Sequence, residues 1–117
     1  LRVIKAIQSA AGNATETGYS SWFDALNSMK KQMDEEDYDV ALIGCGAYGM
    51  SLAAHAKRKG KIAIHLAGWT QMLFGIYGKR WLEDQPQYSR FINEYWVRPD
   101  ESERPKNADT IEGACYW

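Results

Sequence analysis

Apolar and polar positions alternate along the chain in a way that predicts strands and helices in turn. Branched apolar residues predict a first strand over residues 1–7 (LRVIKAI). Apolar positions three and four apart over residues 22–33 predict an amphipathic helix, which Ser20 or Ser21 can cap by accepting a free first-turn amide. The wholly apolar run Val40–Ile43 predicts a second strand that is covered on both faces, as in a parallel sheet.

The same alternation continues to about residue 77. Residues 50–59 suit a second helix, because the cations of its last turn complement the negative end of the helix dipole and Gly60 supplies a stop. Residues 61–66 (KIAIHL) predict a third strand. A helix over residues 70–77 follows, and a further helix is expected over residues 87–94.

This order predicts an α/β fold: a Rossmann-like β-α-β-α-β half of a doubly wound protein, with a small parallel sheet and right-handed crossovers. The single domain 1–117 divides into that core, residues 1–77, and a helix with an irregular, aromatic-rich C-terminal tail, residues 78–117. The chain starts without Met, and three strands leave exposed sheet edges. We therefore expect a piece of a longer chain that packs against an upstream domain or a second copy.

A glycine-rich turn follows the second strand. Gly44, Gly46 and Gly49 are spaced G-x-G-x-x-G between a strand and a helix, where glycines let the backbone approach a phosphate and the helix aims free amides at it. The turn therefore predicts a site for a phosphate or sugar-phosphate, and the alternative is a tight structural turn. A dinucleotide site needs an acidic residue about twenty positions on. His65 and Gly68 flank that position without one, which argues against a dehydrogenase.

Other side chains near the predicted ligand edge are candidates with structural alternatives. Tyr48 can present its hydroxyl to a bound ligand or cover the sheet edge, and Cys45 fits a small buried side chain better than a reactive thiol. His65 ends the third strand and suits binding or acid–base chemistry. Lys79 and Arg80, in the loop GKRW, suit a diphosphate or carboxylate, or form a solvated basic loop.

Composition narrows the function classes. The 117 residues carry a net charge of −1, so no electrostatic footprint for nucleic acid or an anionic membrane is visible. The two cysteines fit no metal spacing and indicate a reduced, cytoplasmic setting, and no apolar run approaches membrane-spanning length. Five Trp and seven Tyr are many for this length, and they indicate either an interface or ligand site, or a tail held down by aromatic packing.

Four strings, GAYG, IHLAG, FGIYGKRW and NEYWVRP, together resemble a GT-D-like bacterial family, which is related to the GT-D type of glycosyltransferase. The resemblance also takes in SSWFDAL and the terminal EGACYW. It implies a Rossmann-like sheet that binds a nucleotide-sugar and transfers the sugar during surface-polysaccharide or glycoprotein assembly. GT-D enzymes hold a divalent cation, Mn or Mg, with an Asp-x-Glu motif. Asp34-Glu35-Glu36 fits that string only formally, so we interpret it as a solvated acidic turn. We expect no cofactor in this chain alone and the cation in an upstream half.

The resemblance carries the family's site onto three clusters of this sequence. These are Gly44, Gly46, Tyr48 and Gly49; then His65, Gly68, Lys79, Arg80 and Trp81; then Asn93, Glu94, Trp96 and Arg98, which Glu112 joins. Glu94 or His65 would deprotonate the acceptor hydroxyl, while cations stabilise the leaving diphosphate. The predicted function is a glycosyltransferase domain. The alternatives are a non-catalytic nucleotide- or sugar-binding module, a protein-interaction module and an NAD-type oxidoreductase.

Overall fold

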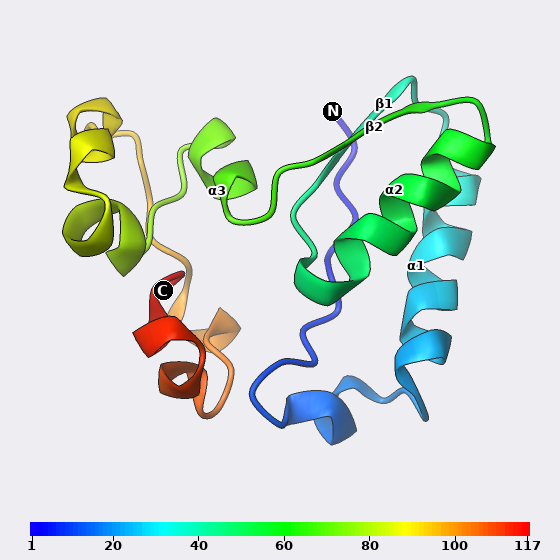
Figure 1. Ribbon diagram of the computed structural model, residues 1–117, viewed down its shortest axis with the longest axis horizontal. Coiled ribbons are helices and arrows are strands. Elements are labelled where there is room, and N and C mark those ends of the chain that lie inside the picture. The colour runs from blue at the N-terminus through cyan, green and yellow to red at the C-terminus, as the bar shows by residue number, and fades with distance from the viewer.

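A computed structural model describes residues 1–117, with side chains described for all but residues 14 and 15. The regular elements are α1 (Trp22–Glu35), β1 (Val40–Ile43), α2 (Gly49–Arg58), β2 (Ile62–His65) and α3 (Trp69–Leu73) (Figure 1). Short 3₁₀ helices and one π-helical turn make up most of the remaining helical structure. The chain is therefore a mixed α/β protein.

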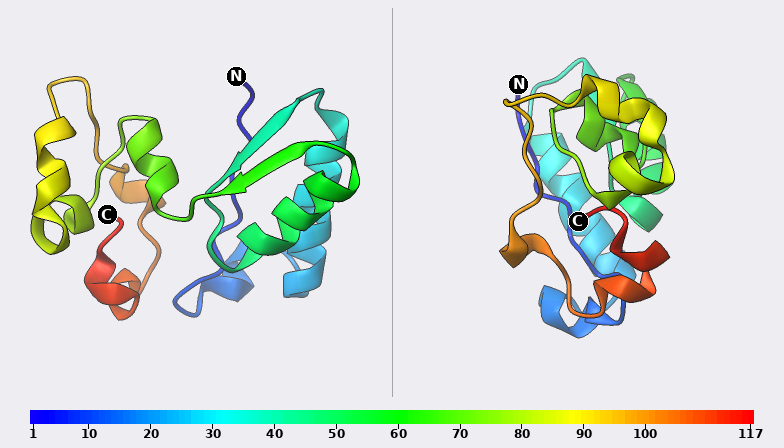
Figure 2. Two further views of the ribbon diagram at one scale, coloured as in Figure 1. Left: turned by 45° about the horizontal axis from the view of Figure 1, so that its top comes forward. Right: turned by 90° about the vertical axis from the view of Figure 1, so that its left-hand side faces the viewer.

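The sheet consists of β1 and β2, which pair in parallel with Val40 opposite Ile62 and Ile43 opposite His65. Helix α2 is the crossover between the two strands and packs on both of them, and α1 packs against α2 (Figures 1 and 2). The predicted strands over residues 40–43 and 61–66 and the helix over residues 50–59 are confirmed to within two residues.

The core lies between the two long helices and the sheet. One stripe of α1, which includes Leu26 and Met29, is buried against Leu52 and Ala56 of α2 and Ile43 of β1. Each large apolar side chain buried in this way stabilises the fold by about 1.5–3 kcal/mol. The helical spacing therefore identified the buried face at Leu26, Met29 and Met33. The first turn of α1 differs from the prediction, because Trp22 and Phe23 are 36% and 68% exposed.

The start of α1 is fixed by a side-chain cap. Ser21 has an extended backbone, and its Oγ accepts a hydrogen bond from the Asp24 amide at 3.1 Å. This satisfies one of the first-turn amides that have no partner within the helix. Of the two predicted caps, Ser21 is the one used.

The predicted strand over residues 1–7 is wrong. This segment has no regular secondary structure and lies outside the sheet, which has two strands and not three. Ile4 and Ile7 pack against the core, whereas the side chains of Leu1 and Val3 are 97% and 83% exposed. The apolar pattern of residues 1–7 therefore reflects packing against the core. It does not reveal whether another strand is available to pair with the backbone of this segment.

One face of the sheet is open. Val40 and Leu42 of β1 and Ile62 and Ile64 of β2 point to the same side, because alternate residues share a face and the register sets them in pairs. All four side chains are exposed, while the other face lies under the helices. The expectation that β1 is covered on both faces is wrong for the described chain.

Beyond β2 the chain forms short turns around an aromatic cluster. Helix α3 ends at Leu73, earlier than predicted, because Gly75 follows with a φ of +68°. A 3₁₀ helix over Pro86–Phe91 replaces the helix expected over residues 87–94. The ring of Trp81, 1% exposed, packs against those of Trp69 and Tyr88, with ring centroids 5.2 and 5.8 Å away. Aromatic packing therefore holds down this irregular part of the chain.

The tail also contacts the N-terminal loop. Asn13 is buried, and its Nδ2 donates to the Lys106 carbonyl at 2.8 Å and to the Ala10 carbonyl at 2.9 Å. The Lys106 ammonium pairs with Glu16 at 2.6 Å. Figure 1 shows the C-terminal turns grouped beside the sheet and its helices, connected to them through the segment after β2.

Candidate functional site

The glycine turn connects β1 to α2, and its three glycines have different structural roles. Gly46 has a φ of +45° with open space around it, so its backbone conformation favours glycine. A β-carbon on Gly44 would lie 2.7 Å from Thr70 Oγ1 of α3, and one on Gly49 would overlap the ring of His65. Two of the three glycines therefore permit close packing.

Two main-chain amides at the start of α2 are already used within the turn. The Tyr48 amide donates to the Cys45 carbonyl at 2.9 Å, and the Gly49 amide donates to the Gly46 carbonyl. A phosphate bound at a helix start uses amides of this kind. It would have to compete with these internal bonds, and the phosphate-binding role of the turn stays a prediction.

His65 lies at the carboxyl end of β2 with its ring against Gly49. Its Nδ1 is 3.1 Å from the Ile43 carbonyl oxygen, which can only accept, so Nδ1 carries the proton in this bond. The neutral ring then presents an unprotonated Nε2, the form that a general base or a metal ligand requires. The acid–base role of His65 stays a prediction.

Tyr48 and Cys45 face the interior. The Tyr48 side chain is buried, its hydroxyl is 2.8 Å from Ser9 Oγ, and its ring stacks on Trp22. Burial raises the pKa of the Cys45 thiol, although a hydrogen bond from the Gly44 backbone acts in the opposite direction. Cys45 therefore behaves as the small packed side chain that the sequence favours, and not as an activated nucleophile.

The residues of the GKRW loop separate in space. Arg80 pairs with Glu112, and its guanidinium lies 4.4 Å from the centre of the Tyr116 ring, which also packs against Gly68. Trp81 is part of the aromatic cluster. Lys79 lines a cavity, and its ammonium is 3.6 Å from the Glu83 carboxylate.

The third predicted cluster is also divided. Asn93 Oδ1 accepts from the Tyr95 amide at 3.0 Å and shapes a turn, and the Trp96 ring packs over Gly75. Glu94 is exposed, with no polar partner in the part of the chain that the structure describes. Arg98 reaches the cavity that Lys79 lines.

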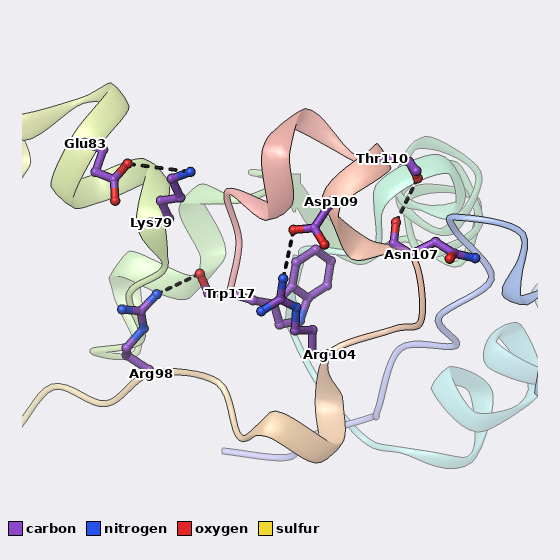
Figure 3. Close-up of polar contacts among 8 residues, drawn as sticks. All are labelled: Lys79, Glu83, Arg98, Arg104, Asn107, Asp109, Thr110 and Trp117. Carbon is purple, nitrogen blue, oxygen red and sulfur yellow. Dashed lines mark hydrogen bonds and ion pairs between the residues drawn. The ribbon is translucent and has the colours of Figure 1, made fainter.

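This cavity, of about 340 Å³, brings together Lys79, Arg98 and residues of the tail. Its charged lining residues are Lys79, Arg98, Asp100, Glu101, Arg104 and Asp109. Arg98 Nη2 donates to the Trp117 main-chain oxygen at 2.8 Å, and Arg104 Nη2 donates to Asp109 Oδ1 at 2.9 Å (Figure 3). No side-chain carboxylate pairs with Arg98 among the described residues, so its guanidinium is the cation best placed to bind an anion.

Arg104, Asp109 and Trp117 were not among the predicted site residues. Arg104 and Asp109 lie in the run DESERPKNAD, whose mixed charges are typical of a solvated loop, and Trp117 lies eight residues beyond it. No motif spacing marks them, because the cavity forms only when residues 113–117 fold back beside Lys79. The sequence therefore carried no local signal for these three residues.

No protein-family model, curated protein or solved structure matches the chain. Among the residues whose side chains are described, no three His, Cys, Asp or Glu side chains gather as a metal site would require. The described helices include none that combines the length and the apolar character needed to cross a membrane.

Proposed function

We propose that this chain is a glycosyltransferase domain of the GT-D-like class and that it binds the diphosphate of a nucleotide-sugar in the cavity lined by Lys79, Arg98 and Arg104. The observation that carries the proposal is the meeting of two cations, predicted from separate sequence strings, in one cavity of about 340 Å³. That volume lies within the range of about 300–1,000 Å³ typical of small-molecule sites.

The lining suits both parts of such a ligand. Arginine guanidinium groups bind phosphate oxygens in pairs of parallel hydrogen bonds, and lysine adds a point charge. Asp100 and Glu101 supply carboxylate oxygens that accept hydrogen bonds from sugar hydroxyls, and the Trp117 indole offers a ring for stacking. Arg98 anchors the diphosphate, because no side-chain carboxylate pairs with it in the described chain.

Calorimetric titration of the chain with UDP, GDP, their sugar conjugates and NAD, with and without Mn²⁺, tests this proposal. We expect saturable binding of a nucleoside diphosphate that weakens at high salt. Arg98→Gln should weaken it by about 10- to 100-fold, the value of a hydrogen bond to a charged group.

Lys57→Gln is the matched control, because it also removes one exposed cation but lies at the end of α2, away from the cavity. Equal losses in Arg98→Gln and Lys57→Gln would mean a non-specific charge effect. Binding of NAD alone would favour the oxidoreductase alternative.

The open sheet face favours a second candidate, a protein-interaction module whose partner is a second copy. Val40, Leu42, Ile62 and Ile64 form an apolar surface, and a two-fold axis would place the same surface opposite itself. Concentration-dependent association in sedimentation, without binding of any nucleotide, would favour this function over the first.

A further inference from the structure

We propose that a second cavity, between the N-terminal loop and the start of α1, binds a neutral sugar unit. This cavity has a volume of about 150 Å³, and six of its eight lining residues carry a hydroxyl group. These six are Ser9, Thr17, Tyr19, Ser20, Ser21 and Tyr48. The inference rests on different residues from the proposed nucleotide site and does not depend on it.

The hydroxyl groups of Ser9, Tyr19 and Tyr48 are held in place and keep hydrogen-bonding capacity. Ser9 Oγ lies 2.8 Å from the Tyr48 hydroxyl, and the Tyr19 hydroxyl lies 2.9 Å from Ser28 Oγ. Each hydroxyl can donate one hydrogen bond and accept two, so a single internal bond leaves capacity for a ligand. Ser21 has less capacity, because its hydroxyl already donates to Asp24 Oδ2 and accepts from the Asp24 amide. Ser20 is exposed, and its hydroxyl has no partner within the described residues. The cavity therefore offers an ordered set of donors and acceptors.

Trp22 supplies an apolar wall beside these hydroxyls. Its ring stacks on that of Tyr48, with centroids 5.1 Å apart and planes 6° from parallel, while 36% of its surface stays exposed. The buried Tyr48 side chain, tied to Ser9, fixes the orientation of this stack. A sugar presents C–H groups on its ring faces and hydroxyls at its rim, and a rigid aromatic ring next to hydroxyl groups complements both.

The absence of charge in the lining narrows the ligand class. None of the residues that line this cavity is ionisable as Asp, Glu, Lys, Arg or His. An anion that left water for this cavity would find no cation among the lining residues, and the Asp24 carboxylate lies 2.8 Å from Ser21 Oγ, so desolvation of the anion is unfavourable. The cavity is also smaller than the about 300–1,000 Å³ of sites for larger ligands. A single neutral sugar unit, free or at the end of a glycan, fits these features.

Saturation-transfer NMR on the full chain tests the inference, with methyl glycosides of glucose, galactose, mannose and N-acetylglucosamine as probes. We expect saturable transfer from the protein to at least one glycoside. Ser20→Ala should weaken that binding about fivefold, as expected for one net hydrogen bond, without removing any internal contact. Trp22→Leu should weaken it further by removing the flat ring. Ser102→Ala, outside the cavity, is the matched control.

Absence of saturable transfer to all four glycosides would overturn the inference. It would also be overturned if Ser20→Ala and Trp22→Leu both bound the glycoside as the parent does, with circular dichroism showing that both are folded. Weakening in either folded variant, with Ser102→Ala unchanged, supports it. Nucleotide binding in Arg98→Gln is measured separately, so failure of one site is distinguishable from failure of the other.

Discussion

At the residue scale, Gly49 is a position where the backbone conformation would accept a side chain but the available space would not. Its φ of −56° and ψ of −46° are those of a right-handed helix, so alanine would fit the backbone and, on helix propensity alone, stabilise α2 by up to about 1 kcal/mol. The ring of His65 occupies the place of a side chain. Overpacking costs about 1–3 kcal/mol, which is larger, so space and not conformation decides this position.

We therefore predict that Gly49→Ala lowers the free energy of unfolding by about 1–2 kcal/mol, because the His65 ring has to move. Urea unfolding followed by circular dichroism measures the change. In a His65→Ala background the same substitution should become neutral or stabilising, since the clash is gone. An equal loss in both backgrounds would contradict the assignment of His65 as the group that occupies this space.

At the element scale, the pattern of apolar and polar residues predicted elements that depend on neighbouring residues. It failed where an element depends on pairing with a distant segment. The Ser21 cap and the α1 stripe depend on residues within a few positions, so they could be recognised. Residues 1–7 have a strand-like composition, but pairing requires a backbone partner elsewhere. The site follows the same rule. The sequence identifies Lys79 and Arg98 as candidate anion-binding residues, but their proximity to Arg104 depends on how the tail folds back.

The contact between α1 and α2 predicts a pH dependence. Asp34 of α1 accepts a hydrogen bond from His55 Nε2 of α2 at 2.9 Å, and this bond, with the Lys59 ammonium at 3.3 Å, lowers the pKa of the Asp34 carboxyl. The ionised carboxylate therefore stabilises the fold above the usual Asp pKa of about 3.9, and this contribution is lost as the pH falls through the lower folded-state pKa.

Asp34→Asn should consequently reduce the free energy of unfolding at neutral pH, and the difference from the parent should shrink in acid. Urea unfolding of Asp34→Asn and of the parent, at neutral and at acidic pH, measures this difference. Asp37→Asn is the control. The Asp37 side chain is fully exposed and lies 3.8 Å from the Lys61 ammonium, and an exposed ion pair of this kind contributes little to the free energy of unfolding. A loss in Asp34→Asn that is the same at both pH values would contradict the linkage.

At the scale of the whole molecule, the fold is a thin body whose helices cover one side of a narrow sheet. Its extents are 37 × 32 × 19 Å, and the shortest corresponds to about one sheet layer and one helix layer, each roughly 10 Å thick. Parallel sheets are usually covered on both faces. The exposed apolar side chains on the open face of β1 and β2 therefore mark the surface where a binding partner is most expected.

Neighbouring positions of β1 distinguish the two faces experimentally. Ile43→Ala should cost about 2–4 kcal/mol of unfolding free energy, because Ile43 is 5% exposed in the core. Leu42→Ala, on the open face, should cost less than about 1 kcal/mol in dilute solution. If a second copy covers this face, the cost of Leu42→Ala in thermal unfolding will rise with protein concentration, because association stabilises only the folded chain. A Leu42→Ala cost equal to that of Ile43→Ala in dilute solution would mean that the face is already buried within one molecule.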